Sequence, residues 1–300
     1  MEKLGALAAF ATAVCWSIGP IFFEGASRKV GALAVNFWKV VFAFFLLAAT
    51  GLIFRGMPFP LDAPLRIWFY LIVSGLIGFV ISDFFLFNAY ILVGSRVAIV
   101  FQSLTPLFTA FFAFFFLGER MLSSQLVGML VVITGILIVV SSRRKKTGPN
   151  QSVKTESTKG YIYSLLASLF QAAGLIFSKI GVKDYDVISS SQIRIMAAIV
   201  GLTAQVLILR QGRKIFTELP KERLAFKNIA IGAIFGPFLG VSFSLLAVRY
   251  TQAGTASTLM ALTPVLIIPP TILILKQKVA IPEFLGAAVA VSGAALFFLL

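Results

Sequence analysis

The sequence is poor in charged residues and in cysteine, and it has no histidine at all. Only 12% of the 300 residues are Asp, Glu, Lys or Arg, whereas a soluble globular domain carries roughly 25%. The hydrophobic residues AVILMFWYC make up 59% of the chain. A chain of this composition cannot cover itself with a polar surface, so we expect its outer surface to face lipid.

The missing residue types exclude several kinds of chemistry. Without histidine the chain can form neither a Ser-His-Asp triad nor a proton relay through imidazole. Cys15 is the single cysteine, so an internal disulfide, a Cys/His zinc site and a haem held by His or paired Cys are all excluded. There is no GxxxxGKS or GxxxxGKT loop to bind a nucleoside triphosphate. We therefore expect no metal, no cofactor and no enzymatic activity.

Basic residues outnumber acidic ones by 26 to 11, which gives a net charge of +15. Such an excess in a soluble protein would suggest nucleic acid. Here the basic residues stand mainly between apolar runs, where they set membrane topology and contact anionic headgroups. We expect a lipid bilayer and no nucleic acid as the partner.

Long apolar runs occupy most of the chain, and a bilayer-spanning helix needs about 20 such residues. The runs are 4–23, 32–54, 68–90, 97–117, 122–141, 160–180, 188–209, 228–248, 253–275 and 281–300. They are too long for strands and lack strict alternation. The sequence predicts an all-α integral membrane protein with ten transmembrane helices, multi-pass in the cell (inner or plasma) membrane.

One polar stretch divides the runs into two groups of five. Residues 142–158 are charged and contain Gly148-Pro149, which is typical of a flexible linker. The predicted organisation is therefore a first repeat at 1–141, a basic linker at 142–158 and a second repeat at 159–300.

The two groups are related in sequence. At an offset of 155 residues Gly19 matches Gly174 and Lys39 matches Arg194; at an offset of 158 further glycines and a Leu-Thr-Pro motif match. These later pairs are Gly78 and Gly236, 104–106 and 262–264, Gly128 and Gly286, and Gly135 and Gly293. Because five is odd, the second repeat enters the membrane in the opposite sense. Inverted repeats of this kind are typical of secondary transporters with a substrate site between the repeats.

The second part of each repeat resembles a known domain. The first copy carries LTPLF at 104–108, FLGER at 116–120 and QLVG at 125–128, and the second carries LTPV at 262–265 and FLG at 284–286. Together they resemble two tandem EamA domains of the drug/metabolite transporter superfamily. The resemblance implies a ten-helix carrier for small metabolites that is not driven by ATP. One departure is Glu119, whose place in the second copy is taken by Gln277.

Three charged residues within the predicted spans, Asp83, Lys39 and Arg194, are candidates for the site. Polar groups are expensive in hydrocarbon, so those present usually face a cavity or a partner. Asp83 is interpreted either as a cation or proton-coupling group, or as part of a structural ion pair or a residue near the headgroup boundary. Lys39 and Arg194 could bind a carboxylate or pair with Asp83, but the interpretation we favour is that their stems carry the charge to the nearer interface.

Uncharged polar side chains within the spans could form a weakly polar substrate cavity. The candidates are Trp16, Ser17, Asn36, Asn88, Gln102, Gln171, Gln192, Ser242 and Ser257. For each residue alone, hydrogen bonding between helices is the favoured alternative. Four prolines inside runs, Pro20, Pro106, Pro237 and Pro264, predict helix kinks.

Lys and Arg counts predict the orientation of the chain. The side shared by both termini carries 7 such residues and the opposite side 17, so the positive-inside rule places the central linker in the cytoplasm. The family resemblance implies the reverse, with the termini inside.

These features predict a secondary-active or facilitative transporter of small metabolites that works by alternating access. Amino acids or related amphipathic solutes are the leading expectation, with export as the direction and protons, through Asp83, as a coupling ion. Uniport competes with coupling, and a monomer would suffice. The alternatives are a multidrug or cation exporter or a carrier of sugar-linked metabolites and, outside this class, a non-transporting scaffold or membrane enzyme.

Overall fold

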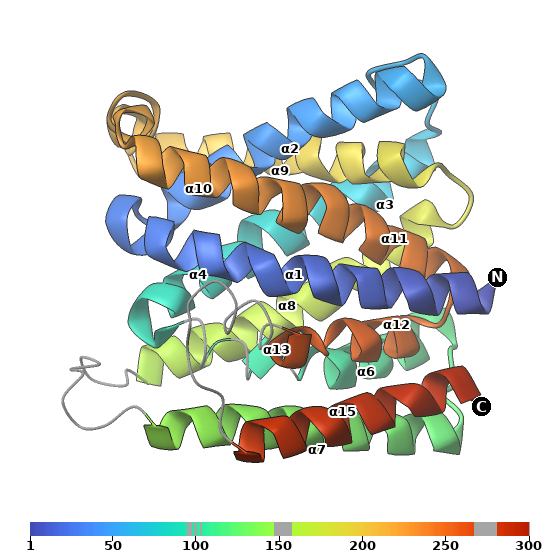
Figure 1. Ribbon diagram of the computed structural model, residues 1–300. Helices are drawn as coiled ribbons and strands as arrows, with labels where there is room; N and C mark the ends of the chain where they lie inside the picture. Colours follow the sequence, from blue (N-terminus) through green and yellow to red (C-terminus); the bar gives the residue numbers. More distant parts are fainter. Residues whose placement is uncertain (95–97, 99–100, 103, 147–157, 267–280, 300) are drawn as a thin grey trace.

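A computed structural model gives the fold (Figure 1) and describes residues 1–94, 98, 101–102, 104–146, 158–266 and 281–299. Every regular element within these ranges is helical. The helices lie side by side, most of them along one common direction (Figure 1). The all-helical prediction is confirmed for this part of the chain.

The first repeat contains five helical units in the order predicted. These are α1 (Glu2–Val30), α2 (Ala32–Arg55), the continuous unit α3–η1–α4 (Leu65–Gly75, Leu76–Ser82 and Asp83–Leu92), α6 (Thr105–Leu117) and α7 (Ser123–Lys146). Mostly apolar sequence runs through each unit and ends at glycine or polar residues. Gly56 and Gly118, for example, close α2 and α6 with a left-handed backbone, which glycine adopts without steric penalty.

The second repeat follows the same order. Its units are α8 (Thr158–Val182), α9 (Val187–Ile208), the continuous unit α10–η4–α11 (Arg223–Ala233, Ile234–Gly240 and Val241–Tyr250), the pair α12 (Ala253–Met260) and α13 (Thr263–Leu266), and α15 (Ile281–Leu299). Two short elements, η2 (Lys214–Glu218) and η3 (Leu219–Lys221), connect α9 to α10.

The third unit of each repeat carries the clearest sign of duplication. Both η1 and η4 are π-helical segments of seven residues, and each boundary of α3–η1–α4 recurs 158 residues later in α10–η4–α11. π-Helical turns are rare, so their recurrence at one offset is strong evidence that the two repeats share a backbone.

Equivalent helices of the two repeats run in opposite directions. Gly5 at the start of α1 lies against Thr251, where an added Cβ would come within 3.1 Å. Lys179, near the end of α8, donates a 2.6 Å hydrogen bond to the carbonyl of the same Thr251. Likewise Arg55, the last residue of α2, donates to Ser189 at the start of α9.

Six helical units are long and apolar enough to cross a membrane: α1, α2, α3–η1–α4, α8, α9 and α10–η4–α11. Shorter apolar helices within the described residues lie at Thr105–Leu117, Leu126–Gly135 and Ala253–Leu266. The predicted fourth and ninth runs each include residues outside the described ranges. The structure thus supports a multi-pass membrane protein, with six spans assigned by length and composition.

The prolines act differently from one another. Pro20 lies inside α1, which continues through it, and Pro237 lies inside η4. Pro106 and Pro264 are each the second residue of a new helix, α6 and α13. Proline suits a first helical turn because its missing N–H has no partner there. The fourth and ninth units are therefore interrupted at equivalent places.

Helices α7 and α15 pack against each other at the edge of the bundle (Figure 1). An added Cβ at Gly135 would lie 2.6 Å from the Gly286 carbonyl, and one at Gly293 would lie 2.7 Å from the Val132 nitrogen. These glycines allow the two helices to approach closely.

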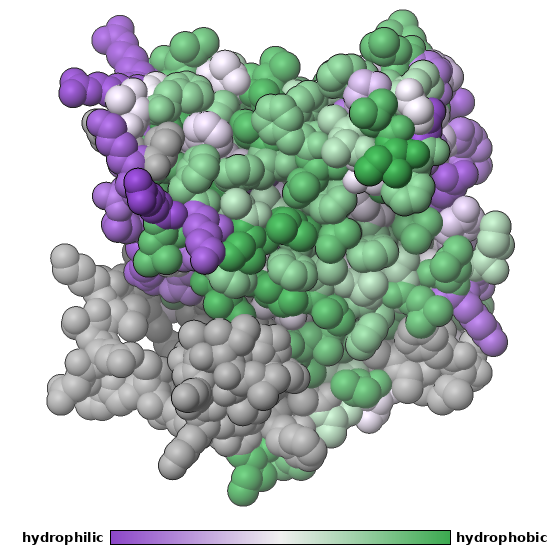
Figure 2. All heavy atoms as spheres, turned by 45° about the horizontal axis from the view of Figure 1, so that its top comes forward, coloured by the Kyte–Doolittle hydropathy of each residue, from purple (hydrophilic) through white to green (hydrophobic). Residues whose placement is uncertain are grey.

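The outer surface is apolar between two polar ends. Figure 2 shows a broad hydrophobic face with hydrophilic residues gathered at its left and right margins. Large apolar side chains are exposed on several helices, for example Phe115 and Phe116 on α6 and Leu207 and Ile208 on α9. Such a surface is stable in lipid and not in water.

Candidate functional site

A cavity of about 180 Å³ lies between the two repeats. Its wall includes residues of α1, α2, η1, α4 and α6 from the first repeat and of α8, α9, η4, α11, α12 and α13 from the second. Neither α7 nor α15 contributes a lining residue among those described. The cavity can hold several waters or one small organic molecule.

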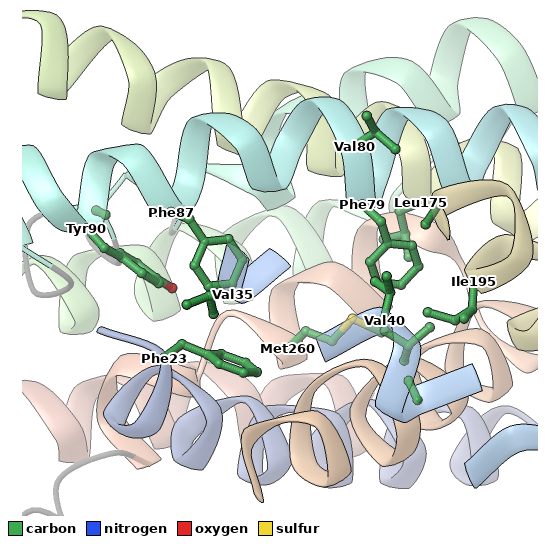
Figure 3. Close-up of a cluster of buried hydrophobic side chains, with 14 of the residues drawn as sticks. Phe23, Val35, Val40, Phe79, Val80, Phe87, Tyr90, Leu175, Ile195 and Met260 are labelled. Atoms are coloured by element: carbon green, nitrogen blue, oxygen red, sulfur yellow. The ribbon is translucent and has the colours of Figure 1, made fainter. Parts of the chain in front are cut away.

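Aromatic side chains form much of the wall. Figure 3 shows Phe23, Phe87 and Tyr90 together on one side and Phe79 with Leu175 on the other. The Phe23 and Phe87 rings meet edge to face with centroids 5.5 Å apart. Met260 lies between the two groups (Figure 3). This part of the wall offers an apolar aromatic surface to a solute.

One buried ion pair stands in the aromatic wall. Lys39 Nζ of α2 lies 2.5 Å from Asp83 Oδ2, the first residue of α4, and the two side chains are 5% and 11% exposed. The ammonium also lies 4.5 Å from the centroid of the Phe87 ring, within range of a cation–π interaction. Lys39 therefore does not reach the membrane interface, and our interpretation of snorkelling is wrong for this residue.

Arg194 of α9 stands on the other side of Phe79. Its guanidinium carbon lies 5.1 Å from the Phe79 centroid, and the residue is 5% exposed. Its Nε has no hydrogen-bond partner, and the structure shows no ion pair for it within the described residues. The snorkelling interpretation fails here too, because the charged end stays inside the bundle.

Glycines make room for this arginine. An added Cβ at Gly75 would lie 2.9 Å from Arg194 Cα, and one at Gly78 would lie 3.2 Å from Arg194 Nη2. Gly78 also faces Gly174 of α8 at a comparable distance. Gly75 at the end of α3 and Gly78 in η1 thus allow α8 and α9 to approach this unit closely and place the guanidinium at the cavity wall.

The structure places some predicted residues in the wall and others elsewhere. In the wall are Trp16, Lys39, Asp83, Gln102, Gln171, Arg194 and Ser257, together with Pro20, Pro237 and Pro264. Outside it are Ser17, Asn36, Asn88, Gln192, Ser242 and Pro106. The first five of these donate hydrogen bonds to the carbonyls of Val14, Phe79, Phe84, Pro58 and Phe238, respectively. Asn36 thereby bonds to another helix, and Ser242 also donates to Ser191 of α9, which is the alternative of bonding between helices. The bonds of Ser17 and Asn88 stay within their own helices, and Gln192 bonds to the loop after α2.

Several lining residues were not singled out from the sequence. Phe23, Phe79, Phe87 and Tyr90 are four of many aromatic residues in the chain, which has 31 Phe and 6 Tyr. Thr105 lines the wall as well and donates to Gln102 at 3.0 Å. No local pattern separates these side chains from others that face lipid, so only the packing identifies them.

Polar contacts between the repeats close the bundle at the end where the chain begins. Lys179 pairs with Glu119, which follows α6. The second oxygen of Glu119 accepts a 2.8 Å bond from the Ala253 amide at the start of α12. A carboxylate at a helix start satisfies a free N–H and the helix dipole. Glu119 therefore ties one loop of the first repeat to two helices of the second.

A second group at the same end joins the loops after α2 and α8. Asp62 accepts from Tyr185 Oη at 2.8 Å and pairs with Arg55 at 2.6 Å. The hydrogen bond from Tyr185 holds the pKa of the Asp62 carboxyl below its ordinary value. Partial burial, with that hydrogen bond, raises the pKa of the Tyr185 hydroxyl.

Comparison with known proteins decides the family. The model of the EamA-like transporter family matches residues 3–141 and again residues 158–299. The chain belongs to the EamA-like transporter family. The two matches confirm the tandem resemblance seen in the sequence, and they identify the protein as transporter-like rather than enzyme-like.

Two relatives agree with this family. An uncharacterized transporter of Clostridium kluyveri is 25% identical over 227 residues, which cover 75% of this chain and 70% of the relative. The crystal structure of another protein superposes on this chain with a TM-score of 0.75 at 18% sequence identity. The superposition covers 99% of this chain and 96% of the other. The second similarity concerns the fold alone.

Proposed function

We propose that this EamA-like protein carries a small amphipathic metabolite across the membrane by alternating access. In this proposal ten helices cross the bilayer as two inverted five-helix repeats, and the solute binds in the cavity between them. The observation that carries the proposal is that both repeats line one cavity. A site shared in this way can be exposed to either side when the repeats rock against each other.

The shared backbone of the repeats supports two states of similar energy. Because the units α3–η1–α4 and α10–η4–α11 match in every boundary, each repeat has the geometry to adopt the conformation of the other. The contacts of Glu119 and Asp62 join the repeats at one end of the bundle. Opening that end would require these contacts to break while contacts at the opposite end form.

The expected substrates are amino acids or related amphipathic solutes, moved outward. An apolar wall with a few charged groups suits a molecule that has one polar end and an apolar body. The test is flux in proteoliposomes, in which the purified protein should speed uptake of a labelled solute and show exchange acceleration by unlabelled solute on the other side. Correctly folded protein that gives no flux for amino acids, their analogues, cationic drugs or sugars would contradict the proposal.

Proton coupling through Asp83 is a separate part of the proposal. Asp83→Asn should remove the pH dependence of transport if that carboxylate carries the proton. Because this change leaves Lys39 unpaired, the double variant Asp83→Asn with Lys39→Gln provides a neutral control. If the pH dependence of transport survives in both variants, Asp83 serves only as a structural ion-pair partner, and uniport is favoured.

A further inference from the structure

The two repeats place a cation at equivalent positions but neutralise only one of them. Lys39 and Arg194 occupy matching positions of α2 and α9. In the first repeat the residue that meets this cation is Asp83, the first residue of α4. The first residue of α11, 158 positions later, is Val241. Val241 lines the cavity with Arg194, so a hydrocarbon side chain stands where symmetry would place a carboxylate.

The net charge of the cavity wall does not depend on where the proton of the Lys39–Asp83 pair lies. The pair of Lys39 and Asp83 sums to zero charge when both groups are ionised, and also when the proton has moved to the carboxylate. Arginine keeps its proton in proteins. The lining side chains described here therefore carry a net charge of +1, located on Arg194.

A buried charge without a partner is strongly unfavourable in a low-dielectric interior. Arg194 is 5% exposed and its Nε is unpartnered. Asp83 attracts it as well, but that carboxylate is in direct contact with Lys39 and neutralises only one charge of the two. Gly78 leaves space beside Arg194 Nη2. A planar guanidinium binds a carboxylate through two parallel hydrogen bonds. A bound anion would supply the carboxylate that Val241 does not.

The rest of the wall limits what the anion is attached to. Phe23 and Phe87 form an aromatic surface (Figure 3), and Phe79 lies beside Arg194 itself. A zwitterion would leave the net charge of the cavity at +1, and a cation would increase it. Only a solute of net charge −1 brings the cavity to neutrality.

We propose that the cavity binds small organic anions that carry one carboxylate and an apolar or aromatic body, and that Arg194 binds the carboxylate. This inference rests on the proposed function, since it names the substrate class of the same cavity. Within the amphipathic solutes proposed above, it narrows the substrate class to net anions and replaces amino acids as the leading expectation, because zwitterions share the carboxylate but not the net charge.

The test compares matched probes that share a phenyl ring and differ in charge. They are 3-phenylpropionate, its neutral amide, zwitterionic phenylalanine and cationic 2-phenylethylamine, with chloride as an inorganic control. Binding is measured from thermal stabilisation of the purified full chain, because a ligand of the native state stabilises it by mass action. We expect 3-phenylpropionate to bind tightest, and equal stabilisation by chloride or by phenylalanine would overturn the proposal.

Variants then test the role of Arg194. Arg194→Gln should weaken 3-phenylpropionate binding by at least about tenfold, because a charge-assisted pair is lost, and should leave binding of the amide unchanged. Arg66→Gln is the matched control, since Arg66 is exposed in the first turn of α3, and it should change neither. Arg194→Lys keeps the charge and should retain the preference for the anion if the first variant fails to fold. Unaltered anion binding in folded Arg194→Gln would overturn the proposal.

Flux of the same probes in proteoliposomes separates the two proposals. Anion binding without flux of any probe would contradict transport and leave the anion site standing. Flux of phenylalanine or 2-phenylethylamine in preference to the anion would support transport and overturn the anion site.

Discussion

The two repeats share a backbone but differ in the polar residues that they add to it. The π-helical segments η1 and η4 and the helices around them match at every boundary. At the same time Asp83 is matched by Val241 and Gly75 by Ala233. Symmetry of the backbone supplies two states of similar energy, whereas the differences in side chains make one site chemically specific. The differences are therefore better guides to the substrate than the similarities.

The largest expected effect compares the two buried cations. Lys39→Met should lower the free energy of unfolding by about 3–5 kcal/mol, because it leaves the Asp83 carboxylate buried without its partner. Arg194→Met removes a cation that has no ion-pair partner among the described residues, so it should leave stability unchanged or raise it. Thermal and denaturant unfolding in one detergent would check both changes, and equal losses would mean that Arg194 is paired as Lys39 is.

The next largest effect is expected at Gly75, whose place in the second repeat is taken by Ala233. Gly75→Ala should cost about 1–3 kcal/mol of stability, because its Cβ would meet the Arg194 backbone and force an overpacked contact. The equivalent Ala233 is buried and carries the Cβ that Gly75 lacks. Gly25→Ala in α1 is the control, since nothing lies within 4 Å of an added Cβ there. This control should be neutral or stabilising by about 0.5–1 kcal/mol, and the same loss in both variants would refute the close approach.

A smaller effect is expected at Glu119, which only the first repeat possesses. Glu119→Gln should lower stability by about 1.5 kcal/mol, because it weakens the charge-assisted bonds to Lys179 and to the Ala253 amide. If these bonds close one end of the cavity, the variant should also label faster at a cysteine introduced into the wall, after Cys15 has been replaced by Ala. Unchanged labelling would restrict Glu119 to a role in stability.

The smallest effect is expected at the exposed Asp62. Its folded-state pKa lies below the ordinary value, so its contribution to stability is complete above the ordinary pKa and is lost as the pH falls through the folded-state pKa. Asp62→Asn should therefore lower the melting temperature slightly at neutral pH, and this difference should disappear in acid. A difference that grows in acid would have the wrong sign for this account.

Much of the fold could be predicted from the sequence because the signals are long and repeated. Apolar runs of span length predicted the helical units, and the matches at Gly78, Gly236 and the two Thr-Pro pairs predicted the duplication. What the sequence lacked was the backbone detail. The π-helical form of η1, for example, is accompanied by a hydrogen bond from Asn36 of α2 to the Phe79 carbonyl, a contact between distant parts of the chain.

The site was predictable only where a residue type is costly in lipid. Lys39, Asp83 and Arg194 stood out because charges are rare in membrane spans, but whether they pair or reach the interface depends on tertiary distances. Phe23 and Phe87 could not be identified from the sequence as lining residues, because phenylalanine is equally stable against lipid and in a cavity wall. Ser17 and Asn88 were predicted to line the cavity because they are polar, yet each donates a hydrogen bond to a carbonyl of its own helix.

The most direct test of the central claim is to restore the missing carboxylate. Val241→Asp would place an acid beside Arg194 at the position that Asp83 holds in the first repeat, and Val241→Asn would introduce a side chain of the same size without charge. Affinity for 3-phenylpropionate should fall by at least about tenfold in Val241→Asp, because Arg194 is then neutralised from within, and should stay near the wild-type value in Val241→Asn. Equal affinities in the two folded variants would contradict the account.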